Sequence, residues 1–415
     1  MSDRAPKEAA YRFLVQPDPW ERATRDMLNR SSLEGLDETL LRQRRAFLRP
    51  DSLVIVVMLT DEDDAGVDPR SVGGQGWAFS SREFPGSKTF RGDPALGTTA
   101  PRATSACETN PLDPDCTSCG FATLCNPSDA ACQKIKNDPA CVSSAYLPPS
   151  EDQMTVRFFD MKRRFGLDPQ FPISRYVAGF TSVAVPSQKE EHPVEGKVIG
   201  SYGALGSCTN PLFAASLPEH ATDELCRLPR GPRPNDLVLF ALIGGIPNHL
   251  VTTTPDWRAL VGNDPDAYDL SGIDMHLLPS RQPRPGLPAP SAVPGDLGPD
   301  PIHGREWDTG GEDLQYSCTF ELETPRVCEN TDPGCDCAND AKPPLCTATT
   351  GEQVRGKAYP PHRELRVARG LGSRAVLGSI CAARVHEQSP GDPLAWYRPT
   401  MNAIVARAKP LLGAP

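Results

Sequence analysis

The clearest hydrophobic pattern in the chain is an unbroken apolar run over residues 53–59. Seven consecutive apolar residues are typical of a strand that is buried on both faces, as in a parallel sheet. The run is followed by Thr60 and then by four acidic residues, Asp61 to Asp64. Because ligands of open α/β sheets bind beyond the carboxyl ends of the strands, this strand end is the first candidate site.

Two further apolar runs predict parallel strands at residues 237–245 and 375–381, and a short strand is predicted at 156–159. Hydrophobic periodicity predicts helices at residues 9–14, 20–28, 36–47, 362–371 and 397–412. This order indicates the α/β class, a partial doubly wound, Rossmann-like parallel sheet with long, irregular cysteine-rich insertions. Because such a sheet ordinarily begins with a strand, we expect its opening strand to lie upstream of Met1.

The same pattern predicts how the α/β fold is interrupted. Residues 1–64 are expected to hold helices and the central strand, and residues 151–278 to continue the domain. Residues 351–415 are expected to close it with a helix, a strand and a helix. A cysteine-rich insertion is expected at 65–150, and a proline-rich and cysteine-rich insertion at 279–350.

Charge excludes some partners. The 415 residues carry 43 basic and 53 acidic side chains, a net charge of −10. This balance argues against nucleic acid or an anionic membrane as the main partner, and it is compatible with a divalent cation. No run of about 20 apolar residues could span a membrane.

Eleven of the fourteen cysteines form two clusters, at residues 107–141 and 318–346. Both clusters lie in segments with few apolar side chains to form a core, which favours disulfide bonds. Zinc is the alternative: Cys116 and Cys119 have CxxC spacing, but no second CxxC or nearby histidine completes a site. Disulfides predict an extracellular or cell-envelope location. The first residues form no signal peptide, so we expect a chain truncated from a longer export precursor; a cytosolic protein with reduced thiols is the alternative.

Residues 54–61, which end in Leu59, Thr60 and Asp61, resemble the fourth strand of the von Willebrand factor type A domain. More specifically, the chain is similar to uncharacterised, cysteine-rich bacterial members of that type, which are predicted to be secreted proteins or lipoproteins. The segments that carry this resemblance are 11–15, 46–52, 163–166, 175–177, 314–318, 335–337, 357–360 and 378–381.

The resemblance implies that Asp61, with Thr60 beside it, contributes to a metal-ion-dependent adhesion site. The family also needs an Asp-x-Ser-x-Ser motif, which this chain lacks. We therefore expect an incomplete site that holds Mg²⁺ or another divalent cation only in the intact parent, with no cofactor assigned to this chain. The alternative for Asp61 is a polar strand-end residue that bonds turn amides, and Glu62 to Asp64 are expected to form a solvated acidic turn.

Catalytic motifs are not apparent. No G-x-S-x-G motif occurs, and no spacing links His249, His276, His303 or His386 to a nucleophile or forms a His-x-x-x-His metal pair. The sequence therefore predicts a non-enzymatic extracellular or envelope-associated binding or adhesion module with a protein or glycan partner. The alternatives are a hydrolase or protease with its catalytic groups in the insertions, and a purely structural surface protein.

Overall fold

The computed structural model describes residues 5–81, 99–123, 125–192, 206–329, 335–337, 343–348, 351–381 and 397–413. The chain divides into two compact units. Unit 1 comprises Met1–Arg49 and Ala65–Gly231, and unit 2 comprises Pro50–Asp64 and Pro232–Pro415.

Unit 2 contains a three-stranded parallel sheet made of β3 (Val54–Leu59), β6 (Val238–Gly244) and β9 (Ala375–Ser379). The strand order is β3-β6-β9, with both pairs parallel. Every residue of β6 is buried, as expected for an apolar strand between two neighbours. The three strands predicted from apolar runs are therefore confirmed, and the molecule is of mixed α/β structure.

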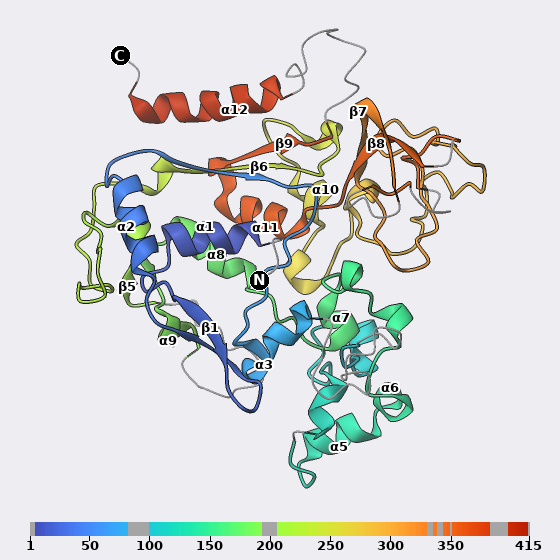
Figure 1. Cartoon of the computed structure of the whole chain (residues 1–415), viewed down its shortest axis with the longest axis horizontal. Coiled ribbons are helices and arrows are strands. Elements are labelled where there is room, and N and C mark those ends of the chain that lie inside the picture. The colour runs from blue at the N-terminus through green and yellow to red at the C-terminus, as the bar shows by residue number, and fades with distance from the viewer. Residues whose placement is uncertain are drawn as a thin grey trace. The chain divides into compact units, whose positions relative to one another are not determined.

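Two helices of unit 2 pack on this sheet. Helix α11 (His362–Leu371) and helix α12 (Arg398–Ala408) both contact β6 and β9. In Figure 1, α12 lies above these strands and α11 lies below them. Ile404 of α12 packs against Ala241 and Val376 of the sheet. Both helices agree with the predicted periodicity.

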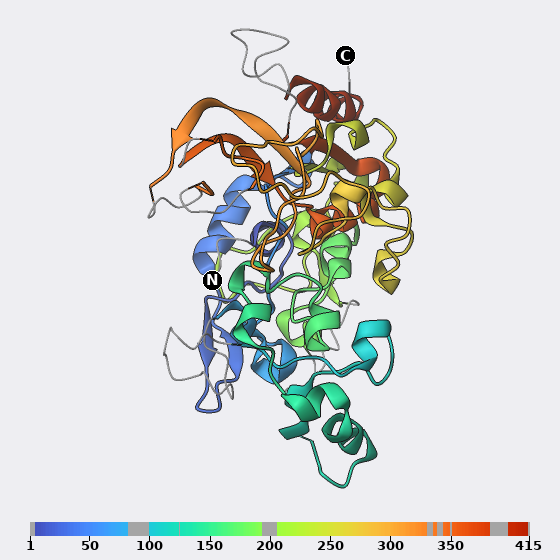
Figure 2. The ribbon, with the colours of Figure 1, turned by 90° about the vertical axis from the view of Figure 1, so that its right-hand side faces the viewer.

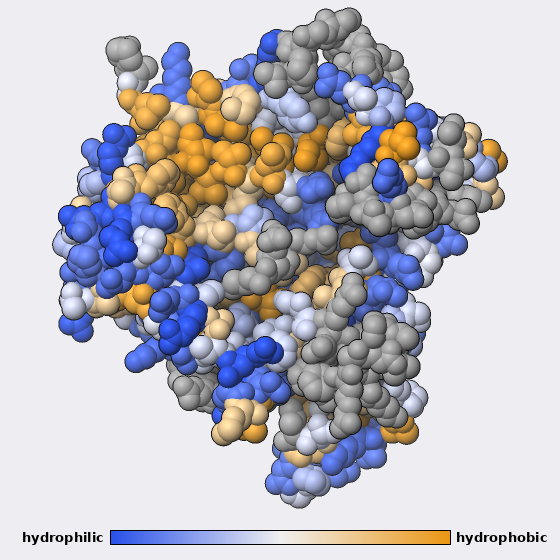
Figure 3. Space-filling model, viewed as in Figure 1, coloured by the Kyte–Doolittle hydropathy of each residue, from blue (hydrophilic) through white to orange (hydrophobic). Residues whose placement is uncertain are grey.

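The prediction that β3 is buried on both faces is wrong. Val54, Val56 and Met58 are buried, whereas Ile55, Val57 and Leu59 alternate with them and are exposed. Among the described residues, β3 pairs only with β6, so it is an edge strand. Helix α12 covers the β6 and β9 part of this face, and hydrophobic side chains gather around α12 and the strands beneath it in Figure 3.

A long antiparallel ribbon in unit 2 consists of β7 (Cys318–Val327) and β8 (Glu352–Ala358), seen from two sides in Figures 1 and 2. The sequence did not predict this ribbon, since β7 falls in the expected irregular insertion. A disulfide between Cys318 and Cys381 joins its first residue to the segment after β9. The short helix α10 (Trp257–Val261) packs against α11.

In unit 1, α1 (Pro6–Leu14) packs against α2 (Glu38–Phe47) and α8 (Ile173–Thr181). The helix predicted at residues 20–28 is wrong, because the chain forms a hairpin of β1 (Arg22–Arg25) and β2 (Ser31–Glu34) there. Asp26 accepts the amides of Leu28 and Arg30 and so fixes the turn.

The strand predicted at residues 156–159 is also wrong. A 3₁₀ turn (Met154–Val156) and a second turn occupy this segment, and the guanidinium of Arg164 binds the carbonyl oxygens of Val156 and Phe159. Those bonds satisfy backbone groups that a strand would have paired with a neighbour.

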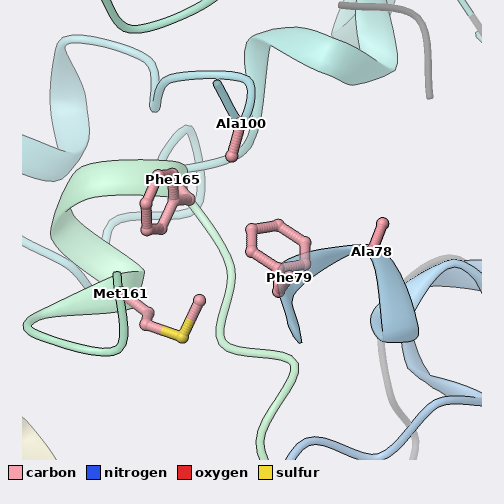
Figure 4. Packing of buried hydrophobic residues seen from close by; sticks show 5 residues of the cluster. All are labelled: Ala78, Phe79, Ala100, Met161 and Phe165. Atoms are coloured by element: carbon pink, nitrogen blue, oxygen red, sulfur yellow. The ribbon is translucent and has the colours of Figure 1, made fainter. Parts of the chain in front are cut away.

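The remaining elements of unit 1 are short. They are α3 (Ser71–Gly74), α4 (Ala106–Thr109), α5 (Ala130–Asn137), α6 (Pro139–Ser143), α7 (Met161–Phe165), α9 (Gln188–Glu191), β4 (Ala184–Val185) and β5 (Cys208–Thr209). One core cluster of this unit contains Phe79, Ala100 and Phe165, with the two aromatic rings edge to face (Figure 4).

All fourteen cysteines lie in disulfide pairs, as the sequence predicted. The alternative of a zinc site at Cys116 and Cys119 is excluded, since each of them is bonded to another cysteine. The pairs are Cys107–Cys116, Cys119–Cys141, Cys125–Cys132, Cys208–Cys226, Cys318–Cys381, Cys328–Cys335 and Cys337–Cys346. Such a set indicates an oxidising environment. None of the described helices combines the length and apolarity needed to cross a bilayer.

Candidate functional site

The sequence-predicted site residues lie at the end of β3. The Thr60 hydroxyl donates to the carbonyl oxygen of Glu62 at 2.7 Å, and the Glu62 amide donates back to that hydroxyl at 3.2 Å. Asp61 is exposed, and its carbonyl oxygen accepts the Tyr359 amide at 2.8 Å. The local contacts of Thr60 are those of a hydroxyl-stabilised turn, and a metal role for Asp61 stays a prediction.

The acidic residues after Asp61 are not a uniformly solvated turn. Asp63 accepts the backbone amide of Arg363 at 2.8 Å, in the first turn of α11, and Asp64 is buried. A carboxylate at a helix N-terminus satisfies an amide that lacks an intrahelical partner. Asp63 therefore has a structural contact within the sheet region of unit 2.

A second group of side chains in unit 2 is close together in space although its members come from two separate segments of the chain. One nitrogen of His276, one carboxylate oxygen of Asp300 and one nitrogen of His303 all lie within 4.8 Å of one another. His303 is fully buried, and the side chains of His276 and Asp300 are 11% and 15% exposed. Among the described residues, this is the one group of three or more such side chains whose geometry could hold a metal ion.

Two turns place these three side chains. Asp274 caps the 3₁₀ turn Met275–Leu277 by accepting the His276 amide at 2.9 Å. Asp300 accepts the amide of His303 at 3.1 Å, so its carboxylate bends back over its own turn. Gly304 closes that turn with a positive φ of 86°, where an added Cβ would lie 2.0 Å from the Leu297 carbonyl oxygen.

The outer nitrogen of each histidine is held by a carboxylate. Asp274 lies 2.9 Å from His276 Nδ1, and Glu306 lies 2.8 Å from His303 Nε2. Glu306 is itself paired with the buried Arg284 at 2.7 Å. Carboxylates in this position fix the ring orientation, and in a neutral imidazole they hold the proton on the outer nitrogen, so that the inner nitrogen can act as a metal ligand.

The inner nitrogens both face Asp300. His276 Nε2 lies 3.3 Å from Asp300 Oδ2, and His303 Nδ1 lies 3.3 Å from Asp300 Oδ1. His303 Nδ1 is too poorly aligned with this oxygen for a hydrogen bond, and it has no hydrogen-bond partner within the described part of the chain. A fully buried ring nitrogen without a hydrogen-bond partner needs an explanation, and an ion or an ordered water can supply one.

The electrostatics of the group favour ionised carboxylates. Burial opposes ionisation of Asp274, but the hydrogen bonds from His276 and His249 lower its pKa below the usual range. The pKa of Glu306 is lowered by His303 and Arg284 in spite of burial, and that of Asp300 by the amides of its own turn. Burial disfavours protonated His276, yet Asp274 and Asp300 raise its pKa.

The separations at Asp300 can be compared with the spacing of zinc ligands. Bonds of about 2.0–2.1 Å at tetrahedral angles put two ligand atoms about 3.3 Å apart. His276 Nε2 and His303 Nδ1 each lie 3.3 Å from a different oxygen of Asp300, and one ligand atom from each residue lies within 4.8 Å of the other two. Two imidazoles and a carboxylate suit zinc and its neighbours among the transition metals, whereas Mg²⁺ prefers oxygen ligands. The arrangement can thus supply three ligands and leave one coordination position open.

Sequence reasoning considered His276 and His303 but did not connect them. They are 27 positions apart, in turns that carry no helical or strand periodicity, and no spacing rule links them. The available local signals were Asp274 two residues before His276 and Asp300 three residues before His303. His386, also considered, lies outside the described residues.

Comparisons with known protein families, with curated proteins and with solved structures found no match.

Proposed function

We propose that this chain is a non-enzymatic binding module of an extracellular or cell-envelope compartment, and that it holds a zinc-class divalent ion at His276, Asp300 and His303. The observation that carries the metal proposal is the orientation of the two imidazoles. Each is tied by a carboxylate on its outer nitrogen, and the inner nitrogens converge on Asp300.

The disulfides support the proposed location, because disulfide bonds form and persist in oxidising compartments outside the cytosol. The three-ligand set supports the proposed binding role. Zinc is usually four-coordinate, so three protein ligands leave a position for water or for a group from a bound protein or glycan. The doubly wound, von Willebrand factor type A-like fold remains part of this proposal, supported by the parallel sheet with helices on it.

The test is a zinc-dependent shift in thermal stability of the metal-free, disulfide-bonded protein. We expect Zn²⁺ to raise the Tm of the wild type, because a ligand at 100 times its Kd stabilises the folded state by about 2.7 kcal/mol. Asp300→Asn and His303→Ala should abolish most of this shift. Asp274→Asn, which removes the carboxylate behind His276, should weaken zinc binding roughly 10- to 100-fold.

The matched control is His220→Ala, which removes an exposed histidine from unit 1 and should leave the zinc response unchanged. The Tm of the wild type and of Asp61→Ala is also measured with Mg²⁺. A Mg²⁺-dependent Tm shift that Asp61→Ala abolishes would come from the end of β3 and not from the histidine site. If zinc stabilises His303→Ala and Asp300→Asn as much as the wild type, the metal proposal is wrong.

A further inference from the structure

A lysine in unit 2 lies between two carboxylates. Lys357 is on β8, and its Nζ lies 2.7 Å from Asp336 Oδ1 and 3.9 Å from Asp313 Oδ2. The three side chains are between 22% and 26% exposed, so all are largely enclosed by protein. The Lys357 nitrogen is thus in direct contact with the carboxyl group of Asp336.

Aromatic rings surround the lysine. Its Nζ lies 5.5 Å from the ring centre of Tyr316 and 5.2 Å from that of Tyr359. Trp307 stacks on Tyr316 with ring centres 5.7 Å apart. These rings help to shield the lysine and its carboxylate partners from bulk water.

The second carboxyl group is placed to carry a proton. The Tyr359 hydroxyl lies 2.8 Å from both oxygens of Asp313 and donates to that carboxylate. Burial raises the pKa of Asp313 even though Lys357 opposes the shift. An acid with a raised pKa exchanges protons near neutral pH more readily than an ordinary aspartate.

Asp336 is held rigidly opposite the lysine. Its neighbours Cys335 and Cys337 are both in disulfides, with Cys328 and Cys346. Its amide donates to Gln353 Oε1 at 2.9 Å. Asp336 Oδ2 is buried and has no hydrogen-bond partner among the described residues. Such preorganisation replaces a bimolecular encounter with an intramolecular one.

We propose that Lys357 and Asp336 condense to form an intramolecular isopeptide bond. Proton transfer first converts the ion pair to a neutral amine and a carboxylic acid. The Lys357 nitrogen then attacks the Asp336 carboxyl carbon, and a C–N bond forms while a C–O bond breaks. Asp313 accepts the proton released by the nitrogen and returns it to the departing hydroxyl, so the products are an amide and one water molecule.

The test is the intact mass of the full chain after reduction and denaturation. We expect the wild type to be lighter than its sequence by one water molecule, and tandem mass spectrometry to find the peptides that contain Lys357 and Asp336 joined. Lys357→Arg keeps the positive charge and should have the full sequence mass, as should Asp336→Ala. Asp313→Asn should slow the reaction and leave a mixture of linked and unlinked chains.

The matched control is Lys162→Arg, which alters another partly buried lysine and should retain the water loss. A wild type with the full sequence mass would overturn the proposal and identify the Lys357 contact as an ion pair. A water loss that persists in Lys357→Arg would also overturn it. Neither result bears on the zinc site, whose ligands are different residues.

Discussion

At the scale of single residues, unit 2 contains a histidine that is held neutral. His362 begins α11, and its Nε2–H donates to the carbonyl oxygen of Leu277 at 2.6 Å. Burial lowers its pKa from 6.5 to about 4. This histidine therefore contrasts with His276, whose pKa is raised by two carboxylates.

The shift at His362 predicts a loss of stability in mild acid. The unfolded state takes up a proton near pH 6.5, whereas the folded state resists it down to about pH 4. The stabilisation present above pH 6.5 is thus lost as the pH falls through this window, by about 2 kcal/mol at pH 5 and about 3 kcal/mol at pH 4. Urea unfolding of metal-free wild type and His362→Gln at pH 7.5 and 5 measures it. The wild type should lose more stability than the variant, and equal losses would contradict the assignment.

At the scale of elements, the sheet of unit 2 has one covered and one partly covered face. Paired positions of adjacent parallel strands point to the same face, so Val57 shares a face with Ala241. Helix α12 covers Ala241 through Ile404, but Val57 is 54% exposed. The adjacent Val56 points to the opposite face and is 8% exposed.

This asymmetry predicts different costs for the same substitution at adjacent positions. Val56→Thr places a hydroxyl in the core and should destabilise unit 2 by about 1–3 kcal/mol. Val57→Thr keeps the β-branched shape on an exposed face and should change stability by less than about 0.5 kcal/mol. Chemical denaturation of the two variants measures this difference. Equal costs would mean that both faces of β3 are buried in solution.

Elements with a long apolar run or a clear apolar stripe could be predicted from the sequence. Strand β6 and helix α11 have the bounds that their patterns indicated, to within a residue. The hairpin at residues 22–34 was missed because its turn depends on the carboxylate of Asp26 rather than on periodicity. An apolar run alone did not reveal that β3 is an edge strand, since the run has no polar residue on its exposed face.

The candidate metal site could not be predicted, for a related reason. Its ligands come from turns whose positions depend on caps, a glycine with positive φ and the pairing of Glu306 with Arg284. Local sequence specifies each turn, but only tertiary packing brings His276 to His303. The sequence predicted that the cysteines form disulfides, but only the fold shows which cysteines are bonded to each other.

At the scale of the whole molecule, disulfides replace apolar packing in the loop-rich parts of both units. Four pairs lie in unit 1 and three in unit 2. Most close short loops, but Cys318–Cys381 spans 63 positions and links the β7–β8 ribbon to the segment after β9. It therefore connects two sheets that share no strand.

Loop length predicts how much each bridge in unit 2 contributes. In the chain-entropy account, removing Cys318–Cys381, with a separation of 63, costs about 4 kcal/mol, and removing Cys337–Cys346, with a separation of 9, costs about 2.5 kcal/mol. Paired Cys→Ser variants, compared by urea unfolding under non-reducing conditions, measure the two costs. If the bridges act mainly by holding local loops, the order reverses, and the shorter bridge beside Asp336 costs more than the longer one.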